Sequence, residues 1–144
     1  MLVGSGQAPL TVLIDSDHDG LPDEWEALYF GAPNVADSDA DSDGDSQSNR
    51  AEYIAGTDPT DPSSYLKVDE ARPDVASNLW VRIEFQAVSN RTYTVQSSDK
   101  VPGGSWSKVS DLPATTTNRP VVIYDSRPAT NATRFYRLRT PKEN

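Results

Sequence analysis

The chain contains no cysteine, one histidine and one methionine among its 144 residues. Without cysteine there can be no disulfide, no zinc–thiolate site and no thiol nucleophile. No apolar run approaches the length of a membrane-spanning helix, so we do not expect a membrane partner. Hydrophobic residues make up only 35% of the chain, which favours two small cores over one large one.

Groups suited to catalysis are also scarce. His18 is the only histidine, and no serine stands in a nucleophile motif, so a catalytic triad cannot be assembled. His18 occupies the fourth position of an acidic loop, which points away from a bound ion. The spacing of the many carboxylates is explained by cation binding rather than by a glycosidase pair. We therefore expect that this segment is not an enzyme.

Basic residues are almost absent from the first half of the chain. Residues 1–66 contain fourteen Asp and Glu side chains and one arginine, a net charge of −13, whereas residues 67–144 contain eight acidic and twelve basic side chains, a net charge of +4. An acidic block of this density repels nucleic acid, which excludes it as a partner. Such a block is typical of a disordered segment or of a site for hard cations.

The first acidic segment, from Asp15 to Glu26, has the spacing D-x-D-x-D-G-x-x-D-x-x-E of an EF-hand calcium loop. In such a loop the ligands are the side chains of positions one, three, five, nine and twelve and the backbone carbonyl of position seven. Gly20 occupies position six, where the backbone turns sharply with positive φ. The predicted ligands are therefore Asp15, Asp17, Asp19, the Leu21 carbonyl, Asp23 and Glu26.

The second acidic segment is crowded with aspartates, so its register has to be chosen. A loop that starts at Asp39 places Arg50 at position twelve, where a cation would face the ion, and one that starts at Asp37 places a serine there. A start at Asp41 puts acidic residues at positions one, three, five and twelve. Ser46 then replaces glycine at position six, which predicts a strained turn and weaker binding than in the first loop. The predicted ligands are Asp41, Asp43, Asp45, the Gln47 carbonyl, Asn49 and Glu52, with Asp37 and Asp39 as candidates for a shared or third site.

The alternative is that these aspartates belong to a solvated linker or form ordinary Asx turns. Two carboxylates about 4 Å apart repel each other by up to about 4 kcal/mol at an effective dielectric constant near 20. Several carboxylates gathered without a cation would spread apart, so the regular spacing favours at least two bound calcium ions. Asp58 and Asp61, each followed by proline, are expected to form turns instead.

Each loop runs into a short stretch whose sequence is typical of a helix. The stretches 23–30 and 49–55 both end at a glycine, which is the usual helix stop. In the first helix, Trp25, Leu28 and Tyr29 are expected to share the buried face. The segments before the loops are short and β-branched or polar and proline-containing, so no incoming helix is predicted. The predicted unit is a loop–helix repeat.

The stretch from Asp15 to about Pro62, with two aspartate-rich loops and a Gly56-Thr-Asp-Pro-Thr-Asp-Pro tail, resembles the thrombospondin type 3 repeats of bacterial secreted proteins, which are relatives of the EF-hand loop. The resemblance covers about a third of the chain. It implies a spacer, stiffened by calcium, between large domains of a secreted or cell-surface protein. Dockerins share the loop–helix arrangement, but these helices lack the paired recognition pattern that a cohesin partner requires.

From Leu66 onward the composition changes to alternating apolar and polar residues. One strand places Leu79, Val81, Ile83, Phe85 and Ala87 on the same face. Further strands are expected over residues 92–97, 105–109, 121–124 and 134–139, separated by Gly, Pro and Asn turns. This pattern predicts a small antiparallel β-sandwich, which resembles the fibronectin type III-like domains that end many large secreted bacterial proteins.

The expected fold class is therefore α+β in two parts. Residues 10–65 are expected to form the calcium-binding loop–helix module and residues 66–144 the β-sandwich. Residues 1–9, which contain Gly, Ser and Gln, are typical of a linker and suggest a piece of a longer chain.

Two tryptophans of the second half are candidate ligand-binding residues, because exposed aromatic rings stack on sugars. The favoured alternative is that the second sheet or the calcium half covers Trp80 and Trp106. The preferred function is structural, with upstream domains of the same chain as partners. The alternative function is an ancillary module of an extracellular enzyme that binds a glycan or a cell-surface protein.

Overall fold

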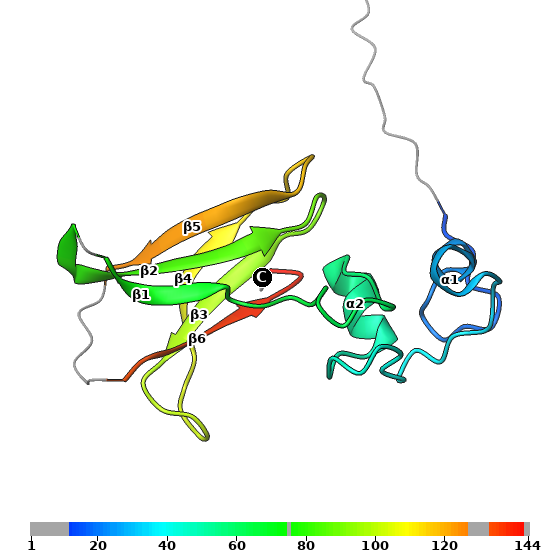
Figure 1. The fold of residues 1–144 in the computed structure, drawn as a ribbon, viewed down its shortest axis with the longest axis horizontal. Coiled ribbons are helices and arrows are strands. Elements are labelled where there is room, and N and C mark those ends of the chain that lie inside the picture. Colours follow the sequence, from blue (N-terminus) through cyan, green and yellow to red (C-terminus); the bar gives the residue numbers. More distant parts are fainter. Residues whose placement is uncertain (1–11, 75, 127–132, 143–144) are drawn as a thin grey trace, which may run out of the picture.

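The computed structural model describes residues 12–74, 76–126 and 133–142. The predicted linker over residues 1–9 lies outside these ranges. The described elements are, in chain order, helices α1 (Asp23–Phe30) and α2 (Asn49–Ala55) and strands β1 (Glu70–Asp74), β2 (Ser77–Ala87), β3 (Tyr93–Ser98), β4 (Ser107–Leu112), β5 (Arg119–Asp125) and β6 (Phe135–Arg139). Figure 1 shows α2 lying between the strands and α1. Among the described residues no helix is long and apolar enough to span a bilayer.

The strands form two antiparallel sheets of three strands each. Sheet A has the order β1-β2-β5, and sheet B has the order β4-β3-β6. In sheet A, Ile83 of the central strand lies opposite Ala71 and Ile123. In sheet B, Val95 of the central strand lies opposite Ser110 and Leu138. The prediction of a small antiparallel β fold for this part of the chain is confirmed.

The two sheets share one hydrophobic core, to which both contribute buried residues: Ile83, Phe85, Ala87 and Val121 from sheet A, and Tyr93, Val95 and Leu112 from sheet B. The rings of Phe85 and Tyr93 meet edge to face with centroids 5.3 Å apart. The Tyr93 hydroxyl accepts a hydrogen bond from the Val88 amide at 2.8 Å, so its polar end is satisfied. Leu66 and Val68 also pack against this core.

Strands β2 to β6 coincide with the predicted ones, with ends that differ by up to three residues. The side chain of Leu79 lies outside the described part of the chain, whereas Ile83 and Phe85 are buried as the alternation predicts. Strand β1 was not predicted, because its sequence is charged and contains Pro73. Proline is tolerated there because β1 is an edge strand with one neighbour.

Helices α1 and α2 have the predicted bounds. Each ends at a glycine with a left-handed conformation: Gly31 has φ 88° and Gly56 has φ 77°. Between residues 12 and 22 and between residues 31 and 48 the chain forms no helix, so the predicted absence of an incoming helix is confirmed.

The expected burial of Leu28 is wrong, because its side chain is 73% exposed. The Trp25 ring packs beside that of Tyr29, with ring centroids 5.1 Å apart. It also meets the ring of Tyr53 of α2 edge to face, with centroids 5.8 Å apart. Glu26, which is fully buried, lies about 100° around the helix from Trp25 on the side away from Leu28. The helix face that carries Glu26 is turned inward, so Leu28, on nearly the opposite side of the helix, is turned to solvent.

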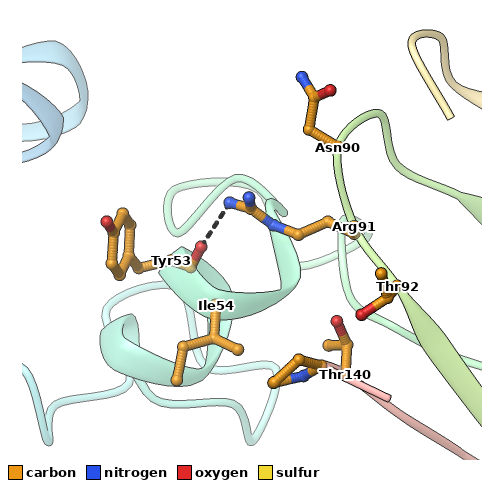
Figure 2. Close-up of a pocket in the computed structure, with 7 residues that line it drawn as sticks. Tyr53, Ile54, Asn90, Arg91, Thr92 and Thr140 are labelled. Atoms are coloured by element: carbon orange, nitrogen blue, oxygen red, sulfur yellow. Dashed lines mark hydrogen bonds between the residues drawn. The ribbon is translucent and has the colours of Figure 1, made fainter. Parts of the chain in front are cut away.

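Helix α2 also contacts the β half directly. The guanidinium Nη2 of Arg91 donates a hydrogen bond to the backbone carbonyl of Tyr53 at 2.8 Å (Figure 2). A Cβ atom at Gly56 would lie 2.9 Å from a methyl group of Val88, so a glycine is required both for this close approach and for its positive φ. A pocket lies beside the contact, lined by Tyr53, Ile54, Asn90, Arg91, Thr92, Thr140 and Pro141.

Candidate metal centres

The two predicted loops each gather three carboxylates. One oxygen atom from each of Asp15, Asp17 and Asp19 lies within 4.8 Å of the others, and Asp41, Asp43 and Asp45 are arranged in the same way. Acidic groups of this kind also occur without a bound ion, so the surrounding contacts decide what each group can do.

The two loops also share their internal hydrogen bonds at an offset of 26 residues. The amide of position six donates to the carboxylate of position one, at 3.0 Å in the first loop and 2.9 Å in the second. The amide of position seven donates to the carboxylate of position five, at 2.8 Å and 2.6 Å. The amide of position nine donates to the carbonyl that precedes each loop, at 2.8 Å in both. The start at Asp41 therefore gives the second loop the same frame as the first.

Each loop has two residues with positive φ, at positions four and six. In the first loop these are His18 with φ 65° and Gly20 with φ 92°, and in the second they are Gly44 with φ 84° and Ser46 with φ 78°. The strained conformation predicted for Ser46 is thus present. Because His18 carries the same kind of strain in the first loop, backbone strain does not distinguish the two loops.

Glu26, the predicted ligand at position twelve of the first loop, is fully buried and accepts three backbone hydrogen bonds. The amide of Asn34 donates to Oε2 at 2.8 Å, and the amides of Val35 and Ala36 donate to Oε1 at 3.0 and 2.9 Å. The carboxylate therefore holds the segment that folds back after α1. Its oxygen atoms are not among the three that gather in this loop.

Asp23, the predicted ligand at position nine of the first loop, is also engaged elsewhere. Its carboxylate accepts the amide of Ser16 at 2.8 Å and the hydroxyl of Ser16 at 2.7 Å. These hydrogen bonds lower the pKa of Asp23. The first loop thus presents the carboxylates of positions one, three and five, while the side chains of positions nine and twelve have protein partners.

Glu52, the predicted ligand at position twelve of the second loop, has a different environment. It is fully buried, and its Oε1 accepts one hydrogen bond, from the Thr57 hydroxyl at 3.1 Å. Burial raises the pKa of Glu52 to about 7, and the charges of Asp43 and Asp45 act in the same direction. Thr57 was not identified from the sequence, although it belongs to the Gly-Thr-Asp-Pro tail.

Four buried oxygen atoms of the second loop have no hydrogen-bond partner within the described part of the chain: Asp43 Oδ2, Asp45 Oδ2, Asn49 Oδ1 and Glu52 Oε2. They belong to positions three, five, nine and twelve, which are all predicted ligand positions. A buried carboxylate or amide oxygen without a partner is costly. A cation held by these atoms would remove that cost.

The remaining aspartates of the acidic half form turns. The carboxylate of Asp37 accepts the amide of Asp39 at 2.9 Å, and its carbonyl accepts the side-chain amide of Asn49 at 2.8 Å. Neither Asp37 nor Asp39 joins the three carboxylates that gather in each loop. Asp58 and Asp61 each accept hydrogen bonds from the residue two positions later, which confirms the predicted turns.

One candidate tryptophan, Trp80, lies in β2 of sheet A, and the other, Trp106, directly precedes β4 of sheet B. Trp80 is 41% exposed on the face of β2 opposite the buried Ile83, so the expectation that the second sheet or the acidic half covers it is wrong. Its ring meets Tyr124 of β5 edge to face with centroids 6.1 Å apart. Trp106, just before β4, is half-buried, and the Arg137 guanidinium lies 4.2 Å from its ring centre.

Comparisons with protein-family models, with curated proteins and with solved structures found no match to this chain.

Proposed function

We propose that residues 12–65 form a calcium-binding structural module, joined to the β-sandwich as a stiff spacer in a secreted or cell-surface protein. The observation that carries this proposal is the set of four buried, unpartnered oxygen atoms at ligand positions of the second loop. All four are hard oxygen donors, the type that calcium prefers. An ion there would supply the partner that the protein itself does not.

The chemistry of these ligands favours calcium over other common cations. Calcium accepts six to eight oxygen ligands in flexible geometry, whereas magnesium demands a near-ideal octahedron and keeps several waters. Zinc sites favour sulfur and imidazole ligands, and the chain has no cysteine and a single histidine. Modules that work outside cells bind calcium in the submillimolar to millimolar range.

The first loop supports the same function with fewer free ligands. Its three carboxylates stand in the frame that the second loop repeats. With Asp23 and Glu26 hydrogen-bonded to the chain, the Leu21 carbonyl and water would complete the shell. The resemblance to thrombospondin type 3 repeats adds to the case for a spacer between domains of an extracellular protein.

Isothermal titration calorimetry of the whole chain should detect two calcium ions, with dissociation constants between micromolar and millimolar. Replacement of Asp41 and Asp43 by asparagine should remove one ion. A matched control, Asp58→Asn with Asp61→Asn, changes the charge by the same amount outside the loops and should keep both ions. Magnesium should compete poorly. No calcium uptake at millimolar concentration would contradict the proposal.

A second function, glycan binding by the β-sandwich, is favoured by the exposed pair Trp80 and Tyr124, which are 41% and 47% exposed. Exposed aromatic rings can stack on sugar rings. A glycan array probed with the chain should show signals that Trp80→Ala abolishes and Trp106→Ala keeps, because Arg137 covers Trp106. Equal array signals from the unmodified chain and Trp80→Ala would refute a sugar site at this pair.

A further inference from the structure

The two loops are tied together by three hydrogen bonds that form a closed ring. The amide of Ser38 donates to Asp19 Oδ2 at 3.2 Å, and the amide of Arg50 donates to the Ser38 carbonyl at 3.0 Å. Nη2 of Arg50 then donates to the Asp19 carbonyl at 2.7 Å. Asp19 is position five of the first loop, and Arg50 lies on α2, at position ten of the second. The ring therefore joins a carboxylate of one loop to the helix that carries Glu52 of the other.

The fit between Arg50 and the first loop is close. A Cβ atom at Gly20 would lie 1.9 Å from Nη2 of Arg50, so only glycine leaves room for the guanidinium. Gly20 therefore serves both the positive φ of position six and this approach. Arg50 is also the only lysine or arginine among residues 1–66, a signal in the sequence that could have identified it.

We propose that Arg50 couples the two loops, so that a calcium ion in one loop raises the affinity of the other. This inference rests on the proposed function. Glu52 lies on α2, two residues after Arg50. When Glu52 binds an ion in the second loop, that ion holds α2 in place. Arg50 then keeps Asp19 in its binding position, so the first loop loses less conformational freedom when it binds its own ion. By linkage, an ion in the first loop strengthens the second to the same degree.

The coupling can be measured with full-length single-loop chains. Asp41→Asn with Asp43→Asn leaves the first loop alone, and Asp15→Asn with Asp17→Asn leaves the second. The coupling factor is the product of the two association constants of the intact chain divided by the product of the single-loop constants. We expect a factor of at least about 5 in the intact chain. It should fall to about 1 in Arg50→Met and to an intermediate value in Arg50→Lys, which keeps the cation but lacks the guanidinium.

Arg91→Met is the matched control, because Arg91 also donates from Nη2 to a backbone carbonyl of α2, at 2.8 Å, without joining the loops. It should leave the coupling factor unchanged. A factor of 1 in the intact chain would overturn the coupling, and a factor that survives in both Arg50 variants would overturn the role of Arg50. Failure of the intact chain to take up calcium would instead overturn the proposed function, and the same titration reports it.

Discussion

Chelation of calcium should unfold the N-terminal half and leave the β half folded. Among the described residues before Leu66, the buried apolar side chains are Leu21, Ala55 and two prolines, Pro22 and Pro59. Large apolar side chains such as Leu28 and Val35 are exposed. Burial of this extent cannot offset the conformational entropy of ordering more than fifty residues or the repulsion among the carboxylates. The bound ions have to supply the difference.

The size of this contribution follows from mass action. At a hundredfold excess of calcium over the dissociation constant, each site adds about 2.7 kcal/mol to the folded state, and two sites add about 5 kcal/mol. This amount equals the whole stability of many small domains. The β half has its own core, with seven buried residues among those that the structure describes, and contains neither loop, so it should not depend on the metal.

Limited proteolysis with and without chelator measures this difference. With chelator, the helical circular dichroism signal should disappear and protease should leave a resistant fragment that begins near Leu66. Asp41→Asn with Asp43→Asn should increase cleavage of the N-terminal half even with calcium present. Equal resistance of the whole chain, or loss of both halves together, would mean that the halves fold as one unit through contacts such as Arg91 to Tyr53.

The substitutions Glu26→Gln and Glu52→Gln should have opposite consequences, although both residues hold position twelve of a loop. Glutamine at position 26 would turn an amide group toward three backbone amides that now donate to a carboxylate. We expect the free energy of local unfolding to fall by about 3 kcal/mol. Hydrogen exchange at residues 34–36 should then be about a hundredfold faster in saturating calcium. The stoichiometry of two ions should persist.

Glutamine at position 52 would remove a carboxylate whose Oε2 has no partner within the described residues. The calcium affinity of the second loop should fall at least about tenfold, since even the loss of groups that only support metal ligands costs 10- to 100-fold. Exchange at residues 34–36 should not change, because Glu26 still holds them. Amide exchange followed by NMR, together with calcium titration, tests both variants. If Glu26→Gln instead loses an ion while these amides stay protected, Glu26 is a metal ligand, as its spacing alone predicts.

Much of the local structure could be predicted from the sequence. The helices end where Gly31 and Gly56 supply the left-handed conformation, and period-two alternation located five of the six strands that the structure describes. The register that starts at Asp41 follows from placing an acidic residue at position twelve, because the starts at Asp39 and Asp37 place Arg50 and Ser48 there. These features depend on neighbouring residues, so short-range spacing is enough to specify them.

The partners of the buried polar groups depended on the tertiary structure. Glu26 and Glu52 have the same residue type and the same loop position, so no local pattern distinguishes them. The chain folds back after α1 and offers three amides to Glu26, whereas after α2 it leads into the sandwich and offers Glu52 one hydroxyl group. The contact between Arg50 and Asp19 likewise spans 31 residues. Spacing along the chain places the oxygen atoms in each loop. Which of these atoms remain without a partner is decided by the distant segments that pack against the loop, because burial and hydrogen bonding depend on every segment nearby.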